Sequence, residues 1–403
     1  MKKLLLDGLR VLDFTQYLAG PTVTRLMAEM GAEIIKVETL PGGDPSRLLP
    51  LVVDGRSGYF VQQNRGKQSL AIDLRREEGL AVVRELVREV DIVVENFGPG
   101  VMEKRGLAWD DLRKLNPSLI MASISAYGRK SQLSHKTGYD WVAQAFAGIM
   151  HMTGNPDGPP TPVGVAMADV SSGVMAFSGL GYALYHRERT GEGQWLDIAM
   201  IDALFHMFEI PVQAHTLSKG AYVPHRAGAG HPLVAPFGVF KGPTGYLVIL
   251  ALQLQWRGLC EAMGQPELEH DPRFAEGPVR ARHQGELTPI IEAWLATQPS
   301  TEAALEQLEK FRVPSAPVLS PADALRHPYF RDRGTLRDIE DPVLGKFSIP
   351  GFPLKFSAQP ELPELVAPLL GQHNARVLQE LLGYDEARIA ALAAAGVIAS
   401  GDR

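Results

Sequence analysis

One acidic residue is a candidate for chemistry because of what surrounds it. Asp169 follows the small apolar run Val165-Ala166-Met167-Ala168 and precedes a predicted helix over residues 170–189. An aspartate at such a point can cap the helix by accepting hydrogen bonds from its first free N–H groups. Those N–H groups and the helix dipole would keep the carboxylate ionised in apolar surroundings. Because a poorly solvated carboxylate is a usable nucleophile towards an activated acyl group, the pattern leaves both a capping and a nucleophilic role open.

The sequence signatures of several other active sites are missing. No G-x-S-x-G elbow and no Walker A motif occur, and no G-x-G-x-x-G follows the first predicted strand. The 11 histidines show no H-x-x-x-H or H-E-x-x-H spacing, and His225 and His231 lack neighbouring Cys or carboxylate ligands. We therefore expect no metal site.

The overall composition excludes further classes of function. The net charge of -6 and a pI near 6.0, with no Lys/Arg run, argue against a nucleic-acid partner. The single cysteine, Cys260, cannot form an intrachain disulfide, which fits a reducing compartment. Asp7 and Arg10 interrupt the apolar N-terminal run, and no stretch reaches membrane-spanning length. We expect a cytoplasmic protein without a membrane partner.

The elements that must position Asp169 follow from hydrophobic periodicity. One helical pattern begins at Pro21 and another covers residues 77–90. These helical patterns separate short apolar runs that predict strands. Strands alternating with helices at this spacing indicate βαβ units, and right-handed crossovers would make the parallel sheet Rossmann-like. The predicted strands cover residues 9–14, 33–37, 70–74, 91–95, 119–125 and 195–199, and later helices cover 139–150, 170–189 and 202–217.

A chain of 403 residues is longer than one hydrophobic core usually serves. Residues 220–245 are rich in Gly, Pro and Ala, and a strand at 246–250 and three helices between 254 and 310 follow. Four prolines between residues 314 and 328 precede short strands within 335–360 and two helices within 373–396. We predict a large domain of residues 1–219 and 326–403, and a small α+β domain of residues 220–325.

Short stretches spread over the whole chain, each weak alone, together resemble the class III CoA-transferases, the family of formyl-CoA and carnitine CoA-transferases. Their order and spacing carry the resemblance. The stretches are Leu12-Asp13-Phe14, Ala19-Gly20-Pro21, Ile35-Lys36-Val37-Glu38, Gly42-Gly43-Asp44, Glu95-Asn96-Phe97-Gly98-Pro99-Gly100, Gly138-Tyr139-Asp140, Ala168-Asp169, Thr190-Gly191-Glu192-Gly193-Gln194 and Leu369-Leu370-Gly371-Gln372-His373.

The resemblance implies a fold and a reaction. A Rossmann-like domain would combine the N- and C-terminal segments, and two ring-like subunits would form an intertwined homodimer. Asp169 would attack the donor thioester to give a mixed anhydride and then an aspartyl-CoA thioester, from which the acceptor acid takes CoA. Coenzyme A thioester is then a co-substrate, and no tightly bound cofactor, ATP or metal is implied.

Further site residues come from position in the family pattern. Arginine and lysine suit the phosphates of CoA through charge-assisted hydrogen bonds. The resemblance implies that the CoA site includes Gln16, Arg75, Asn96, Phe97, Lys104, Tyr139, Asp140 and Met200. Candidates for the acid substrate are Tyr17, Arg47, Arg226 and His231, and for the last three a structural role stays open.

Activities related to CoA transfer remain as alternatives. α-Methylacyl-CoA racemases share the fold and the aspartate but use a His in a Gly-His-Asp motif, where this chain has Tyr139, and tyrosine with a pKa near 10 is a poor acid/base replacement. Residues 226–240 and 369–373 most resemble members acting on short dicarboxylates such as succinate, itaconate, mesaconate or citramalate, so we expect succinyl-CoA as donor. The alternatives are a racemase-like isomerase, a transferase for monocarboxylates (carnitine, an aromatic acid) and an acyl-CoA-binding protein without catalysis.

One segment departs from the family pattern. Gly228-Ala229-Gly230-His231 corresponds to a mobile lid in some members, with fewer glycines here.

Overall fold

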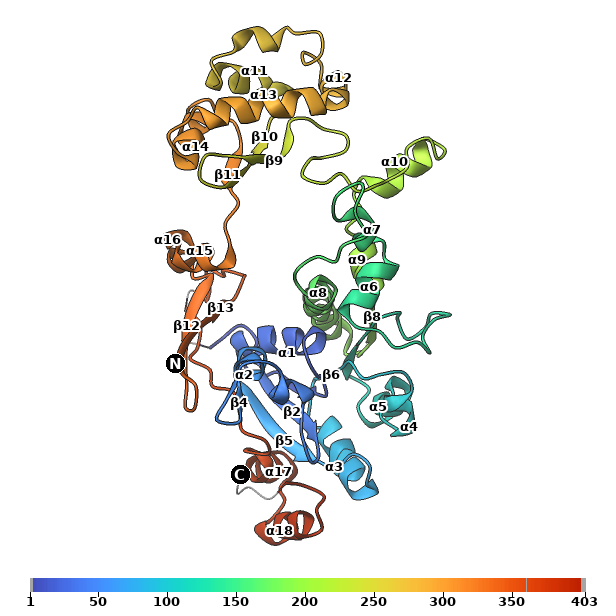
Figure 1. The fold of residues 1–403 in the computed structure, drawn as a ribbon. Helices are drawn as coiled ribbons and strands as arrows, with labels where there is room; N and C mark the ends of the chain where they lie inside the picture. Colours follow the sequence, from blue (N-terminus) through green and yellow to red (C-terminus); the bar gives the residue numbers. More distant parts are fainter. Residues whose placement is uncertain (1–2, 360, 400–403) are drawn as a thin grey trace. The chain divides into compact units, whose positions relative to one another are not determined.

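The computed structural model describes residues 3–359 and 361–399, and the chain packs into two compact units (Figure 1). The first unit comprises Met1–Ala147, Gly164–Glu209 and Tyr329–Arg403, and the second comprises Gly148–Val163 and Ile210–Pro328. The domain limits drawn from the sequence stay a prediction, and the second unit takes in residues 148–163, 210–219 and 326–328 beyond the predicted small domain.

A six-stranded sheet forms the centre of the first unit. Its strands are β1 (Arg10–Asp13), β2 (Glu33–Thr39), β5 (Lys67–Ile72), β6 (Ile92–Glu95), β7 (Ile120–Ser125) and β8 (Trp195–Ala199). They run in the order β5-β2-β1-β6-β7-β8, and every neighbouring pair is parallel. Counted along the chain, this is the 3-2-1-4-5-6 order of a doubly wound sheet, which places a topological switch point between β1 and β6. The predicted α/β class and Rossmann-like sheet are confirmed.

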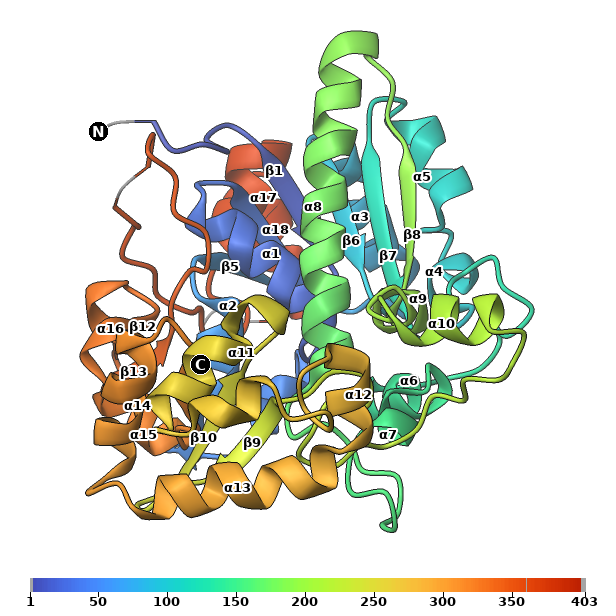
Figure 2. The same cartoon turned by 90° about the horizontal axis from the view of Figure 1, so that it is seen from above.

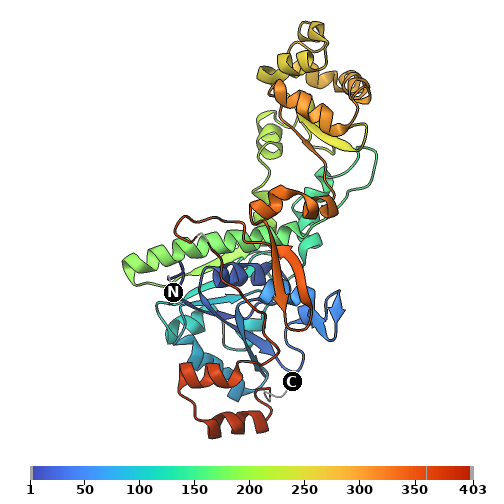
Figure 3. The same ribbon diagram turned by 90° about the vertical axis from the view of Figure 1, so that its left-hand side faces the viewer.

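Helices cover both faces of this sheet, as Figures 2 and 3 show. On one face lie α3 (Glu77–Val87), α5 (Trp109–Leu115) and α17 (Asn374–Leu382), whose apolar stripes pack on the buried strand residues. On the other face lie α1 (Ala19–Glu29) and the long helix α8 (Met167–Thr190). The residues of the first core include Leu12, Ile35, Leu70, Leu80, Val83, Leu86, Val93, Leu112, Met121, Val377 and Leu378.

Two glycines allow α1, α8 and the turn before α1 to approach closely. A Cβ atom on Gly173 would lie 2.6 Å from the carbonyl oxygen of Ala19, and one on Gly20 would lie 2.3 Å from Cγ2 of Thr15. Real Cβ atoms do not come so near to other heavy atoms, so both positions require glycine as the backbone stands. Because Asp169 precedes Gly173 by one helical turn, this contact fixes Asp169 beside the turn that follows β1.

The C-terminal segment returns to the first unit and completes it. The hairpin β12 (Leu336–Asp341) and β13 (Gly345–Pro350) is tied to the N-terminal region by a buried ion pair, in which Arg56 Nη2 lies 2.7 Å from Asp341 Oδ2. The guanidinium of Arg56 also donates to the carbonyls of Ala367 and Pro368. The N–H of Gly371 donates to Ser69 on β5, and α17 and α18 (Glu386–Ala394) follow.

Two helices predicted as continuous are interrupted. The pattern over 139–150 forms α6 (Asp140–Phe146) and α7 (Ile149–Met152), because Gly148 adopts a left-handed φ of 91° that no helix continues. The pattern over 202–217 forms α9 (Met200–Phe205) and α10 (Pro211–Leu217), since Pro211 has no N–H and is accommodated at the start of a helix. The remaining short elements of the first unit are η1 (Pro45–Leu48), β3 (Val52–Val53), β4 (Arg56–Ser57), α2 (Gly58–Asn64) and α4 (Val101–Lys104), and α16 (Pro328–Asp332) follows the second unit.

The second unit is built on a small antiparallel sheet. Its order is β11-β10-β9, with β9 (Phe237–Lys241), β10 (Tyr246–Leu250) and β11 (Ser315–Pro317). The buried Trp256, Cys260 and Phe274 belong to its separate core, and the burial of Cys260 agrees with a packing role. Its helices are α7, α10, α11 (Gln253–Ala262), α12 (Gly277–Arg282), α13 (Gln284–Ala296), α14 (Thr301–Lys310) and α15 (Pro321–Arg326), with η2 (Pro266–Glu269).

Candidate active site

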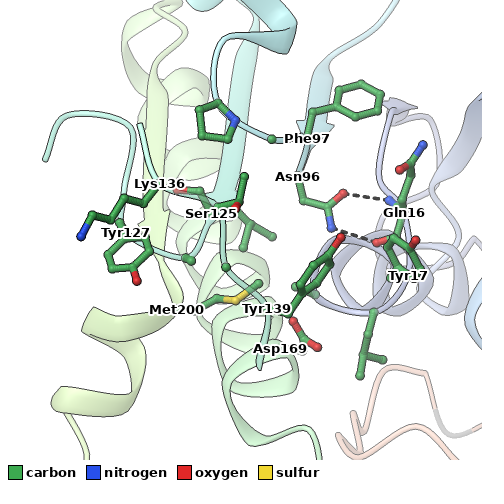
Figure 4. A pocket seen from close by; sticks show the side chains of 18 of the residues that line it. Gln16, Tyr17, Asn96, Phe97, Ser125, Tyr127, Lys136, Tyr139, Asp169 and Met200 are labelled. Carbon is green, nitrogen blue, oxygen red and sulfur yellow. Dashed lines mark hydrogen bonds between the residues drawn. The ribbon is translucent and has the colours of Figure 1, made fainter. Parts of the chain in front are cut away.

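A pocket opens where four strands of the central sheet end. Gln16 and Tyr17 follow β1, Asn96 and Phe97 follow β6, Ser125 ends β7, and Met200 follows β8. Ligands of doubly wound sheets bind at the carboxyl ends of the strands next to the switch point, and this pocket has that location. The other residues that line it are Leu18, Ala19, Gly98, Pro99, Ile124, Ala126, Tyr127, Ser134, Lys136, Thr137, Gly138, Tyr139 and Asp169 (Figure 4).

Asn96 joins two sides of the pocket. Its Oδ1 accepts a hydrogen bond from the N–H of Gln16, and its Nδ2 donates to the carbonyl of Gln16, both at 2.8 Å (Figure 4). The next residue, Tyr17, has a left-handed φ of 64°, which is uncommon for a residue with a side chain. Its ring lies edge-on to that of Tyr139, with the centroids 6.1 Å apart. Asn96 therefore shapes the turn after β1.

Asp169 lines the pocket but does not cap its helix, so the capping role expected from the sequence is wrong. Helix α8 begins at Met167, and Asp169 is its third residue, with no capping bond from its side chain. The capping oxygen belongs to Asp140 on α6, whose Oδ1 accepts from the N–H groups of Ala168 at 2.6 Å and Asp169 at 3.2 Å. A partner 29 residues away in the sequence thus satisfies the first free N–H groups of α8.

The charge state of Asp169 follows from this arrangement. Burial raises the pKa of Asp169, and the nearby carboxylate of Asp140 raises it further, to about 7. The expectation that the helix terminus keeps Asp169 firmly ionised is therefore wrong as well. A carboxylate with a pKa near neutrality is a stronger base than an ordinary aspartate, and perturbed groups of this kind mark functional sites.

The structure gathers most of the predicted CoA-site residues around one pocket and leaves two outside. Asp140 is buried directly behind Asp169. Arg75 is an exposed residue whose guanidinium pairs with Asp73 at 2.8 Å. Lys104 is exposed at the end of α4, and neither cation lines the pocket. The predicted residues that do line it are Gln16, Tyr17, Asn96, Phe97, Tyr139, Asp169 and Met200.

Three candidates for the acid substrate lie elsewhere. Arg47 places its guanidinium on the buried Glu38, 2.7 Å away, and does not line the pocket. Arg226 belongs to the second unit and donates to the carbonyls of His151 and Asn155. His231, also in the second unit, stacks on Phe237 with ring centroids 5.2 Å apart. The predicted lid segment is bonded to β9, since the N–H of His231 donates to Phe237 and that of Val239 to Ala229.

Several site residues were not found from the sequence. Lys136 lines the pocket, and its only signal was its place two residues before Gly138. The hydroxyl of Tyr59 on α2 has its pKa raised to about 12 by burial and by the charges of Asp169 and Asp44, which identifies it as a neighbour of the carboxylate. Arg105 lies over Phe97, 5.3 Å from the ring centroid, and its buried Nη1 has no hydrogen-bond partner in the described part of the chain.

Among residues 3–359 and 361–399, no group of three or more His, Cys, Asp or Glu side chains comes together as a set of metal ligands. No described helix has the length and apolar character needed to cross a membrane.

Comparison with known proteins places this pocket in a family. The family described as CoA-transferase family III matches residues 6–374. The chain belongs to CoA-transferase family III. The family resemblance seen in the sequence motifs is thus confirmed, and the pocket lies within the matched region of this transferase.

Individual relatives cover almost the whole family III chain. The succinyl-CoA:mesaconate CoA-transferase of Haloarcula hispanica is 41% identical over 386 residues, which cover 93% of this chain and 96% of the relative. The succinyl-CoA–D-citramalate CoA-transferase of Chloroflexus aurantiacus is 36% identical over 396 residues, covering 98% of each chain. A crystal structure of a CAIB/BAIF family protein from Brucella suis is similar with a TM-score of 0.81 and 35% identity, covering 94% of this chain and 100% of that one.

Proposed function

We propose that this family III enzyme transfers CoA from succinyl-CoA to a short dicarboxylic acid, with Asp169 as the nucleophile. The observation that carries the proposal is a half-buried carboxylate with a pKa near 7 in a pocket at the switch point of a family III fold. A carboxylate so placed can be ionised at neutral pH and is shielded enough to attack a thioester.

The reaction needs only the Asp169 carboxylate and CoA itself. The carboxylate attacks the thioester carbonyl of the donor, the C–S bond breaks, and a mixed anhydride and CoA thiolate result. The thiolate then attacks the Asp169 carbonyl carbon, and breaking the C–O bond releases the donor acid and leaves an aspartyl-CoA thioester. The acceptor carboxylate attacks this thioester to give a second anhydride, and the thiolate takes the acceptor acyl group. Each step exchanges one activated acyl group for another, so no external energy source enters.

The pocket offers groups for each part of the substrates. We assign the turn of Gln16 and Tyr17 and the hydroxyl of Tyr139 to the acyl group, because they line the pocket together with Asp169. Lys136 and Arg105 are the cations placed to meet CoA phosphates, one on the pocket wall and one against Phe97. Arg75 and Lys104, which the sequence suggested for this task, have their charges outside the pocket, so we propose at most a peripheral contact for them.

The choice of acids follows from relatives rather than from one side chain. Two relatives covering more than nine-tenths of the chain act with succinyl-CoA on mesaconate and on D-citramalate. Both acceptors carry two carboxylates on a short carbon skeleton, as itaconate does. We therefore propose mesaconate, citramalate and itaconate as the first acceptors to test. The role of Arg226 and His231 at a distal carboxylate stays a prediction from the sequence. We place the reaction in the cytoplasm.

We also propose that the enzyme is a homodimer. Large apolar side chains on α6 and α8 face solvent in the single chain, which is uncommon for a surface without a partner. They include Trp141, Phe146, Tyr182 and Tyr185, each more than half exposed. Light scattering after size exclusion should give twice the chain mass of 43.9 kDa, and a monomer at micromolar concentration would contradict the proposal.

A trapping experiment tests the nucleophile. The enzyme is incubated with succinyl-CoA and then treated with hydroxylamine or borohydride, and the modified peptide is identified by mass spectrometry. We expect the adduct on Asp169, and none in Asp169→Ala. An adduct on another residue, or none in an enzyme that turns over, rules out the mechanism. A panel of free acids with succinyl-CoA, followed by chromatography of the CoA thioesters, identifies the acceptor.

A further inference from the structure

Buried charged side chains hold the backbone of the turn that enters the pocket. The N–H of Thr15 donates to Asp13 Oδ1 at 2.8 Å, and its carbonyl accepts from Nζ of Lys36 at 2.7 Å. The N–H of Tyr17 donates to Asp44 Oδ1 at 3.2 Å. The side chain of Asn96 bonds both the N–H and the carbonyl of Gln16. Five successive backbone polar groups, from the N–H of Thr15 to the N–H of Tyr17, are therefore bonded to side chains.

The charged members of this network are joined to one another beneath the turn. Lys36 Nζ lies 2.9 Å from Asp44 Oδ2, and Lys67 Nζ lies 2.9 Å from Asp13 Oδ2. All four side chains are at most 1% exposed. Buried charges are costly unless they are paired, and here the two positive and two negative groups neutralise each other. An apolar core could exclude water equally well, so the pairing points to a need for these hydrogen bonds.

A second layer fixes Asp44 itself. Its N–H donates to Glu38 Oε2 at 3.0 Å, and Glu38 is held in turn by Arg47 and Ser69. A Cβ atom on Gly43 would lie 2.6 Å from Glu38 Oε2, so only glycine fits there with this backbone. These contacts give a structural role to two of the family stretches, although neither contributes a side chain to the pocket lining. The stretches are Ile35-Lys36-Val37-Glu38 and Gly42-Gly43-Asp44.

The held turn is in an unfavourable conformation. A φ of 64° at Tyr17 costs free energy for a residue with a Cβ and persists only where the surroundings impose it. This conformation brings both Gln16 and Tyr17 to the pocket that Asp169 lines. Strain of this kind gathers at functional sites, where it fixes groups in advance of binding.

We propose that Asp44 and Lys36 are positioning residues of the active site, which hold the Thr15–Tyr17 turn in the strained form that presents Gln16 and Tyr17 to the acyl group on Asp169. The inference rests on the proposed function for the identity of that acyl group. Neither residue touches the pocket, and both act through the backbone of the turn. Lys36 fixes the carbonyl on one side of Gln16, and Asp44 fixes the N–H on the other side.

The test uses the full-length enzyme and reads the turn directly. Amide hydrogen exchange is followed by mass spectrometry on peptides that contain residues 12–20, in the wild type, Asp44→Ala and Asp341→Ala. Asp341→Ala is the matched control, because it also removes the acid of a buried ion pair in the same unit, at 2.7 Å from Arg56. We expect the turn to exchange at least about tenfold faster in Asp44→Ala and to be unchanged in Asp341→Ala, since local opening reports local loss of bonds.

Steady-state CoA transfer is the second readout. Asp44→Ala should lower kcat at least about tenfold and change KM for the CoA thioester by less than about threefold, because orientation rather than binding is lost. Asp44→Asn keeps an oxygen that can accept from Tyr17, and it should restore most of the protection and of kcat. If Asp44→Ala does not fold, Asp44→Glu keeps the charge towards Lys36 while displacing the acceptor, and the same loosening and loss of kcat are expected.

Two outcomes of the exchange measurement overturn the positioning role. One is a turn that exchanges as in the wild type when Asp44 is altered, and the other is equal loosening in Asp341→Ala, which would indicate general destabilisation. Unchanged kcat in a variant with a loosened turn would equally contradict it. If the wild type transfers CoA to no acid in the panel, the proposed function fails, while the exchange measurements still decide whether Asp44 holds the turn.

Discussion

The carboxylate of Asp140 accepts a hydrogen bond from the backbone N–H of Asp169 at 3.2 Å and, through its charge, helps to raise the pKa of the Asp169 side chain. One residue thus secures the start of α8 and adjusts the acid that α8 carries. The cap and the candidate nucleophile are two different carboxylates, which separates properties that the sequence pattern seemed to combine in one.

The pH dependence of catalysis should follow the raised pKa. Only ionised Asp169 can attack the thioester, so single-turnover rates should rise with pH and level off above an apparent pKa of about 7. Asp140→Asn keeps an oxygen for the cap but removes the charge, and its rate profile should move to lower pH. Burial, the larger cause of the shift, remains, so the move should be partial. A profile that Asp140→Asn leaves in place would contradict the electrostatic coupling.

The same pKa predicts how stability changes with pH. The folded state holds the Asp169 proton up to pH about 7, whereas an unfolded aspartic acid loses it near its ordinary pKa of 3.8. The native state therefore binds more protons between these values, and this contribution to stability is lost as the pH rises from 4 to 7. Asp169→Asn removes this pH-dependent loss of stability. With allowance for solvent screening, the variant should be more stable than the wild type by about 2 kcal/mol at pH 8. The two proteins should converge near pH 4 in thermal melts, and a constant difference would be unexpected.

The contact between α1 and α8 gives a prediction with a control in the same helix. Gly173→Ala places a methyl group 2.6 Å from the Ala19 carbonyl, and overpacking of this kind should cost about 1–3 kcal/mol and lower activity by shifting Asp169. Gly181 lies in the same helix with open space around its Cβ position, so Gly181→Ala should stabilise α8 by about 0.5–1 kcal/mol. Melting temperatures and kcat of both variants check this, and equal effects would show that the close approach is unimportant.

Recognition of CoA phosphates should depend on the pocket cations rather than on the exposed ones. Lys136→Ala should raise KM for succinyl-CoA roughly tenfold, the size of one charge-assisted hydrogen bond. Lys104→Ala and Arg75→Ala should change it less than about twofold, because solvent screens exposed charges and Arg75 already pairs with Asp73. Initial rates at two ionic strengths provide the measurement, and a larger effect for Lys104 than for Lys136 would reverse our assignment.

Local patterns were sufficient to predict the strands of the six-stranded sheet, whereas for Asp169 they left a capping and a nucleophilic role open. Short apolar runs bounded by Gly and Pro mark β1, β2 and β6 within a few residues, since a parallel strand is buried on both faces. The strand order and the switch point depend on pairings between distant segments, which no single run encodes. The small residues before Asp169 similarly indicated a poorly solvated carboxylate, whereas Asp140, which caps α8, belongs to another helix.

Charged residues were the hardest to assign. Arg47 was expected to meet a substrate carboxylate, but it is bound to Glu38, nine residues earlier on β2. Lys36 looked like an ordinary strand residue and is fully buried beneath the active-site turn. In each case the side chain's role is set by a partner that folding brings close, and residue type and spacing do not contain that information.

The return of the C-terminal segment also has a consequence for synthesis. During translation Arg56 leaves the ribosome long before Asp341, Ala367 and Pro368, which are its partners in the folded unit. The first unit therefore cannot reach its final core while the nascent chain is still growing, and contacts of such long sequence separation form slowly. Newly made chains should depend on protection from aggregation until the last helices are released, and loss of the segment after residue 328 should leave a buried arginine without its counter-charge.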